Sequence, residues 1–189
     1  MISATRNPRA LLAIPVALAT ILLCGGAPAE TPAAETPSVH VAPMDAVGPR
    51  AVEEQTKSAL IQDYLHAWQT MGTAFDQNRP DVLQPYFVGI ARDQLSNTIR
   101  DQQALGIQTL YRDESHDIRV LFYSPEGLSI QLIDTVDLEV EVRDNGKTVG
   151  TQHVRTNYVV LLTPTESKWK VRIFQSGAQS PREAESAAN

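Results

Sequence analysis

Apolar and polar residues follow two different periods along the chain. From Pro49 onward, apolar residues recur every three or four positions, which places them on one face of a helix. They are Ile61, Tyr64, Leu65, Trp68, Met71 and Phe75. The spacing predicts a long first helix, and Pro49, which follows Gly48, is a suitable residue to open it.

Two further helices are predicted before the period changes. Asn78 is a suitable N-cap for a short second helix that has Pro80 and Asp81 in its first turn. A third helix is predicted from about Ile90 to a stop at Gly106. The compact region should therefore begin with three helices.

After Gly106 the period is that of strands, because apolar and polar residues alternate. Five runs are rich in β-branched and aromatic residues: 107–112, 117–123, 128–143, 148–162 and 168–175. Asn145-Gly146 is a strong turn signal, since a two-residue type I′ hairpin needs positive φ at both central residues. This order predicts an α+β fold with three N-terminal helices packed on the concave face of a curved, mainly antiparallel sheet.

Asp134 is a lone carboxylate on an apolar strand face. The residues that share its parity are Leu128, Ile130, Leu132, Val136, Leu138, Val140 and Val142. If Asn145 and Gly146 form the turn without a bulge, the register puts Arg155, Asn157 and His153 on the same face as Asp134. The prediction is a polar patch set among apolar neighbours.

This patch has two interpretations. A desolvated Asp134 would have a raised pKa and could act as a general base, with a tyrosine such as Tyr64 as hydrogen-bond donor, whereas a nearby Arg155 would hold it ionised as a ligand anchor. Alternatively, a β-bulge beside Ile133 turns the carboxylate to solvent and the Asp–Arg pair is only an ion pair. Trp68 and Tyr64 either line a ligand pocket or belong to the core.

Composition and charge exclude several function classes. Without residues 1–29 the chain carries 14 basic against 22 acidic side chains, which disfavours nucleic acid as a partner. Cys24 is the only cysteine, and the four histidines lack the spacing of a metal site, with His116 placed in a polar turn over residues 112–117. No glycine-rich phosphate loop or serine-centred elbow is present, so we expect neither a metal nor a cofactor.

Residues 1–29 have the layout of a secretory signal peptide. Two arginines precede an apolar run over residues 10–23, and Ala27-Pro28-Ala29 provides a small-x-small cleavage site. A membrane anchor over residues 10–29 is an alternative. Lipidation of Cys24 is another, because Ile21-Leu22-Leu23-Cys24 resembles a lipobox, although the residue before the cysteine is normally small.

The rest of the chain divides into three parts. Residues 30–49 are a Pro/Ala-rich stretch without an apolar period, typical of a solvated spacer. Residues 50–176 contain all the predicted helices and strands and form one domain. Residues 177–189 are predicted to be a disordered tail.

Over roughly residues 50–176 the chain resembles the nuclear transport factor 2-like superfamily. The resemblance lies in the long first helix with Trp68, the short helix after Asn78-Arg79-Pro80-Asp81, the hairpin at Asn145-Gly146 and the closing strand with Lys168-Trp169-Lys170-Val171. It implies a cone with an open pocket between helices and sheet, and often a homodimer through the outer sheet face. It does not imply one activity, because members include isomerase-like and dehydratase-like enzymes as well as non-catalytic envelope domains.

These observations predict an exported periplasmic or cell-envelope domain that binds a protein partner or a small apolar ligand and is not an enzyme. Its ligand-binding residues would be Asp134, Arg155, Asn157, His153, Trp68 and Tyr64. The alternative is a small acid–base enzyme, isomerase-like or dehydratase-like, that has Asp134 at the bottom of a deep pocket. A third hypothesis is a dimer-forming role through an apolar patch on the outer sheet face.

Overall fold

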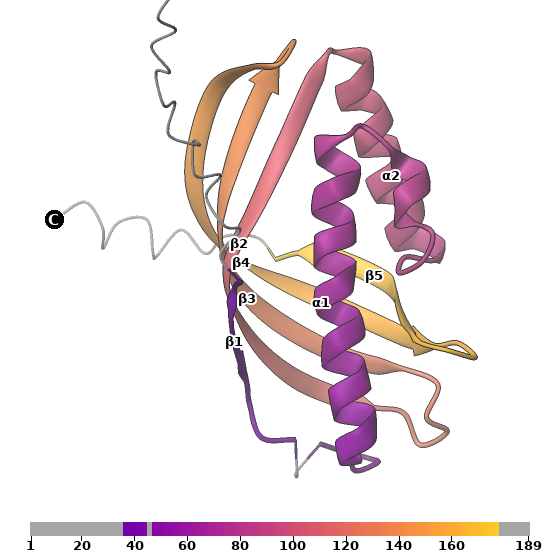
Figure 1. The fold of residues 1–189 in the computed structure, drawn as a ribbon. Helices are drawn as coiled ribbons and strands as arrows, with labels where there is room; N and C mark the ends of the chain where they lie inside the picture. Colours follow the sequence, from indigo (N-terminus) through magenta and orange to yellow (C-terminus); the bar gives the residue numbers. More distant parts are fainter. Residues whose placement is uncertain (1–35, 45–46, 178–189) are drawn as a thin grey trace, which may run out of the picture. The chain divides into compact units, whose positions relative to one another are not determined.

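The computed structural model describes residues 36–44 and 47–177 (Figure 1). The elements follow in the order β1 (Ser38–Val41), α1 (Glu54–Asp76), the 3-10 helix η1 (Pro80–Leu83), α2 (Gly89–Ala104), β2 (Ile107–Tyr123), β3 (Ile130–Asp144), β4 (Lys147–Pro164) and β5 (Trp169–Ser176). The predictions for the leader, including Cys24, and for the tail beyond Gly177 lie outside the described residues. Within the described residues, none of the helices has the length and apolar character that crossing a membrane requires.

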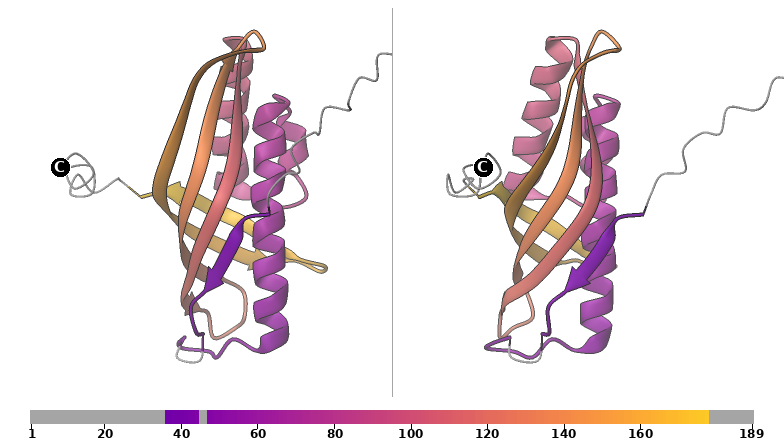
Figure 2. Two further views of the ribbon diagram at one scale, coloured as in Figure 1. Left: turned by 60° about the vertical axis from the view of Figure 1, so that its left-hand side comes forward. Right: turned by 90° about the vertical axis from the view of Figure 1, so that its left-hand side faces the viewer.

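One curved sheet and two α-helices make up the fold. The sheet has the strand order β1-β2-β3-β4-β5, and its neighbours are antiparallel except for β1, which is parallel to β2. Both α-helices lie on its concave side (Figures 1 and 2). The α+β prediction is confirmed, but the second of the three predicted helices is a four-residue 3-10 turn.

The core lies between α1 and the concave face of the sheet. The buried residues of α1 recur at three- and four-residue steps, as an amphipathic helix requires; they are Leu60, Tyr64, Ala67, Trp68, Met71, Ala74 and Phe75. The helix begins later than predicted, at Glu54, because Pro49 forms an isolated bridge with Tyr123 instead of opening it.

The prediction that Asn78 caps the short helix is wrong. Its φ is +53°, and Arg79 is the N-cap residue of η1. The Asn78 amide donates to the carbonyl of Ile107 at 2.9 Å and accepts a hydrogen bond from Gln102 at 2.6 Å. Asn78 therefore ties the end of α1 to both α2 and β2.

The predicted spacer contains a strand. β1 pairs in parallel with β2, so that Val39 lies opposite His116 and Val41 opposite Ile118, and Met44 is buried. The prediction that the domain begins at residue 50 is wrong, since the alternating valines of this short segment complete one edge of the sheet.

β2 is one strand where two were predicted. A bulge between Asp113 and Ser115 leaves Glu114 without a partner on β3. Residues 113 and 116 would face opposite sides of a regular strand, but the extra residue brings both to the concave side. The polar turn predicted for residues 112–117 is therefore wrong, and the segment becomes part of the buried interior.

The β3–β4 hairpin has the predicted turn and a different register. Asn145 and Gly146 have φ values of +47° and +79°, as a type I′ turn requires. A register shift after Arg143↔Thr148 leaves Val149 unpaired. From there every residue of β4 pairs one position away from the predicted partner, which reverses the face of its side chain.

A prediction follows for this turn. We expect Gly146→Ala to lower the free energy of unfolding by about 1–2 kcal/mol, because a Cβ is disfavoured at positive φ. The added Cβ would meet no atom within 4 Å, so the cost comes from the backbone alone. Gly150→Ala is the matched control, since Gly150 has equal space and no positive φ. Equal urea midpoints for the two variants would contradict this assignment.

Candidate functional site

A buried chain of polar side chains joins α1, β2 and β3. The Tyr64 hydroxyl donates to Asp134 Oδ2 at 2.8 Å, and His116 Nδ1 donates to the same oxygen at 2.7 Å. The other ring nitrogen of His116 donates to Asp113 Oδ2 at 3.2 Å. The bulge at Glu114 makes this arrangement because it turns Asp113 and His116 to one face.

The centre of this cluster is closed to solvent. Asp134 and Tyr64 have 0% exposure and His116 has 1%. Burial raises the pKa of Tyr64 well above its usual value, and the negative charge of Asp134 raises it further. The hydroxyl therefore stays protonated as a hydrogen-bond donor.

His116 carries a positive charge between two carboxylates. Burial alone would lower the pKa of His116, but the hydrogen bonds and charges of Asp113 and Asp134 outweigh it and raise the pKa to about 9. The geometry agrees, since a carboxylate only accepts and both ring nitrogens must therefore donate. The hydrogen bond from His116 also lowers the pKa of Asp113.

Aromatic rings fill the space around this cluster. The Trp68 ring lies edge-on to His116 at 5.2 Å, to Tyr158 at 5.1 Å and to Phe174 at 5.4 Å, measured between ring centroids. Tyr158 and Phe174 are stacked at 4.7 Å. The open pocket that the family resemblance implied beside Asp134 is therefore occupied by side chains in this part of the cone.

Two polar atoms in this interior, Trp68 Nε1 and Asp134 Oδ1, are buried without a hydrogen-bond partner among the described residues. An unpaired buried polar atom destabilises the folded state. The carboxylate is nevertheless neither turned to solvent, as the bulge hypothesis predicted, nor placed at the floor of an open cavity.

A surface groove of about 350 Å³ lies between α1 and β2, next to this cluster. It is lined by Trp68, Gln69, Gly72, Thr73, Asp76, Leu110, Tyr111, Arg112 and Asp113. Asp113 belongs both to the groove and to the buried chain. A second groove of about 610 Å³ runs between η1 and α2 and has mainly charged and polar walls.

The other predicted site residues lie on the outer face of the sheet. Arg155 pairs with Asp137, and the Thr135 hydroxyl donates to Asn157 Oδ1 at 2.8 Å. The Val149 bulge explains this correction, because it reverses the face of β4 relative to Asp134. The residues of the predicted patch therefore lie on opposite sides of the sheet, with Asp134 on the concave side and Arg155, Asn157 and His153 on the outer side. A ligand-binding role for them stays a prediction.

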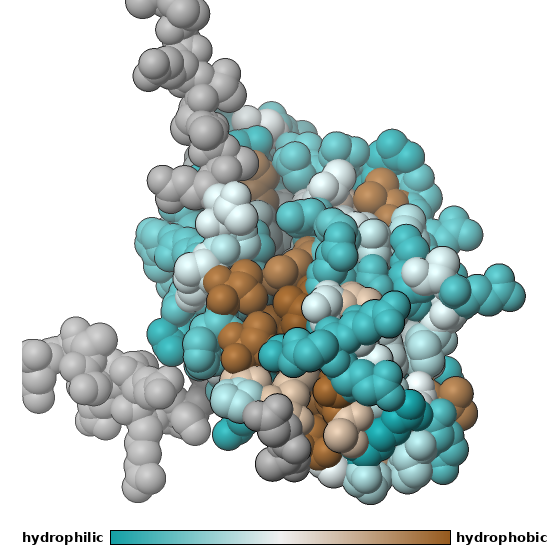
Figure 3. Space-filling model, turned by 60° about the horizontal axis from the view of Figure 1, so that its bottom comes forward, coloured by the Kyte–Doolittle hydropathy of each residue, from teal (hydrophilic) through white to brown (hydrophobic). Residues whose placement is uncertain are grey.

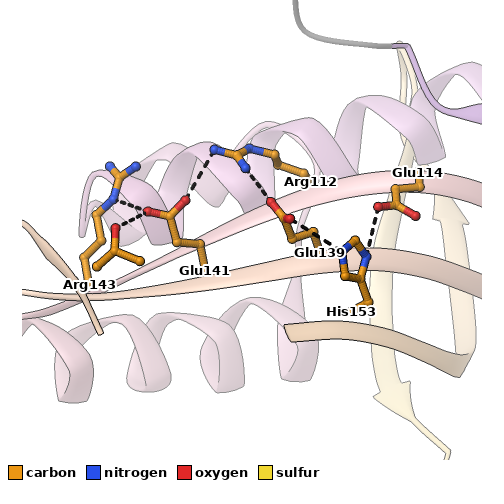
Figure 4. Close-up of polar contacts among 7 residues, drawn as sticks. Arg112, Glu114, Glu139, Glu141, Arg143 and His153 are labelled. Carbon is orange, nitrogen blue, oxygen red and sulfur yellow. Dashed lines mark hydrogen bonds and ion pairs between the residues drawn. The ribbon is translucent and has the colours of Figure 1, made fainter. Parts of the chain in front are cut away.

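A ladder of charges crosses this outer face (Figure 4). His153 lies between Glu114, at 3.2 Å, and Glu139, at 3.7 Å. Arg112 joins Glu139 to Glu141, and Glu141 also accepts from Arg143 and Thr148. Among the described residues, no group of three or more His, Cys, Asp or Glu side chains is arranged to hold a metal ion.

Several large apolar side chains are exposed. They are Val39, Ile90, Leu105, Leu121, Phe122, Leu128 and Val149. Leu121, Phe122 and Leu128 lie close to the β2–β3 turn. Figure 3 shows apolar side chains gathered among hydrophilic ones when this end of the molecule faces the viewer.

Comparison with known proteins gives structural likeness only. No protein-family model and no curated protein matches the sequence. The intermembrane-space region of the chloroplast protein ARC6 is similar with a TM-score of 0.53 and 14% identity, over 68% of this chain and 98% of that one.

Two bacterial structures are similar at lower scores. A proposed scytalone dehydratase from Novosphingobium aromaticivorans has a TM-score of 0.47 and 14% identity, over 66% of this chain and 89% of that one. A proposed dehydratase of the NTF2-like family from Streptomyces avermitilis has a TM-score of 0.42 and 11% identity, over 63% of this chain and 96% of that one. At these identities the likeness concerns the fold alone, a curved and mainly antiparallel sheet with helices on its concave face.

Proposed function

We propose that this chain is an exported cell-envelope protein whose domain binds a partner and does not catalyse a reaction. The observation that carries the proposal is the closed state of Asp134, which has 0% exposure and is held by Tyr64 and His116. A general base must come within hydrogen-bond reach of the proton that it removes. Aromatic rings occupy the space that a substrate would need.

The charges of the cluster support the same proposal. His116 is protonated at neutral pH and cannot accept a proton. The high pKa of Tyr64 keeps its proton on the hydroxyl. Apart from Asp134 Oδ1, which has no partner, the Tyr64 hydroxyl and both ring nitrogens of His116 find their hydrogen-bond partners within the cluster, as expected of a group that fixes α1 onto the sheet.

The cellular location rests on the sequence of the leader. A basic start, an apolar run and a small-x-small site are the features of an export signal. The ARC6 region that is similar to this fold is described as lying in an intermembrane space. The proposal is that the leader delivers the domain to the periplasm or envelope, with cleavage, anchoring or lipidation at Cys24 as the alternatives.

A small apolar ligand is a second candidate for the bound molecule. The groove between α1 and β2 offers the side chains of Trp68, Leu110 and Tyr111 and a volume of about 350 Å³. Ligand pockets start near 300 Å³. Native mass spectrometry of protein purified without refolding tests this candidate, because a retained ligand adds mass that denaturation removes.

Export gives a direct test of the proposal. Expressed with a C-terminal tag in a Gram-negative host, the full chain should appear in the periplasmic or membrane fraction, because residues 1–29 have the signal layout. A variant that begins at residue 30 is the control and should stay in the cytoplasm. Labelling by palmitate would assign lipidation to Cys24, and Cys24→Ser should remove the label. A full chain that stays cytoplasmic with its leader attached would contradict the proposal.

A further inference from the structure

Within the part of the chain that the structure describes, one half of β4 forms a free edge of the sheet. β5 pairs with β4 only from Tyr158 to Pro164. Over residues 147–157 β4 has β3 on one side, and no strand of the described ranges lies on the other (Figure 2). The helices pack against β2 and β5, so this edge is also uncovered by them.

The position of its unpaired backbone groups follows from the ladder. Gly177 N–H donates to the Asn157 carbonyl at 2.6 Å, which shows that the backbone of Asn157 points away from β3. Because the direction alternates along an antiparallel strand, the N–H and C=O groups of Arg155, His153 and Thr151 point the same way. These groups are a template for another strand.

The charge of this edge indicates the kind of segment that it accepts. Residues 147–157 contain Lys147, His153 and Arg155 and no acidic residue, although the whole chain has a net charge of −6. The side chains of His153 and Arg155 are 71% and 62% exposed, and on the β3 side they pair with Glu139 and Asp137. A second copy of this edge would bring basic residues together, whereas an acidic segment would place carboxylates on the other side of these residues, opposite the acidic residues of β3.

We infer that β4 binds an extended acidic segment of a partner protein, which adds antiparallel to residues 151–155 as a further strand on the side of β4 that faces away from β3. The inference rests on the proposed function, since it names the site and the partner class of a binding domain. Main-chain hydrogen bonds would provide the affinity, and pairing of acidic side chains with His153 and Arg155 the specificity.

A designed peptide tests the inference. The probe is a fluorescent, end-blocked peptide, Thr-Glu-Val-Glu-Val-Glu-Thr, and fluorescence anisotropy with the chain lacking residues 1–29 measures its binding. We expect the same peptide with Lys for Glu to bind roughly tenfold more weakly or worse, which corresponds to about 1.4 kcal/mol. Two N-methylated forms of the peptide, each methylated at one of the two sets of alternate residues, test the backbone pairing. The form that lacks the N–H donors facing β4 should not bind, whereas the other form should bind.

Thr151→Pro is the matching change in the protein. It removes a donor that points away from β3, so the β3 ladder keeps its hydrogen bonds, and binding should fall roughly tenfold. Thr151→Ala is the control, since it keeps the backbone and should bind as the parent does. Circular dichroism checks that both variants fold, and the N-methylated peptide tests the edge without any change in the protein.

Several results would overturn the inference. Equal binding of the N-methylated and parent peptides would show that β4 pairing is not used. Self-association that Thr151→Pro abolishes would assign the edge to a second copy, and stronger peptide binding after deletion of residues 178–189 would assign it to the tail. If an envelope partner cross-links equally to the parent protein and to Thr151→Pro, the edge of β4 is excluded as its binding site. The proposed function, a domain that binds a partner, would still stand.

Discussion

Replacing Asp134 with alanine should lower the free energy of unfolding by about 3–5 kcal/mol, because the buried charge of His116 loses one of its two carboxylate partners and the buried Tyr64 hydroxyl loses its acceptor. Asp134 accepts hydrogen bonds from Tyr64 and His116 and has no exposed surface. Without it, the positive charge of His116 would face only Asp113. Urea denaturation at pH 7 measures the change.

Asp137→Ala is the matched control on the same strand. Asp137 lies on the outer face and pairs with Arg155, whose side chain is 62% exposed. Exposed ion pairs contribute about 0–1 kcal/mol, so this variant should unfold within about 1 kcal/mol of the parent. Similar losses in both variants would mean that Asp134 is not enclosed as described.

The stability of the domain should fall as the pH rises from about 6.5 to 9. The pKa of His116 is raised from 6.5 to about 9 in the folded protein, so the folded state holds a proton that the unfolded state releases in this range. The contribution is complete below pH 6.5 and is lost as the pH passes the folded pKa. A shift of this size corresponds to about 3 kcal/mol.

The measurement is a series of urea unfolding curves between pH 6 and pH 10. His116→Gln is the control: it is less stable than the parent, but its stability should be nearly independent of pH in this range because the titrating group is gone. A parent curve that is flat or rises with pH would show that His116 is neutral in the folded protein. The pH series then separates the cluster from general charge effects.

The elements of this fold could be predicted where a local signal decides them. The apolar stripe of α1 and the turn at Asn145-Gly146 depend on spacing within a few residues, and the structure contains both. The α+β order follows from the change of period after Gly106. These features need no knowledge of distant parts of the chain.

The candidate site could not be predicted in the same way, because two bulges decide it. One extra residue at Val149 moves Arg155 to the face opposite Asp134. Another at Glu114 turns Asp113 and His116 into the core. A bulge is fixed by packing across the whole sheet, so the alternation of residues along one strand does not show it.

One signal in the sequence did point to His116. The polar segment 112–117 contains no glycine, proline or asparagine, although its Asp113, Ser115 and Asp117 are of types that turns also favour. If a strand continues through this segment, some of its polar side chains are buried against other elements. Those side chains then need hydrogen-bond partners. Tyr64 and Asp134 are such partners, and they come from helix and sheet positions that are 70 residues apart.

The most direct test of the central claim is a crystal structure of the chain without its leader, purified without refolding. The account predicts that Asp134 is enclosed by Tyr64 and His116, that the rings of Trp68, Tyr158 and Phe174 fill the surrounding space, and that no ligand density reaches the carboxylate. Density of a bound molecule in contact with Asp134, in a pocket open to solvent, would contradict the account and favour an acid–base enzyme.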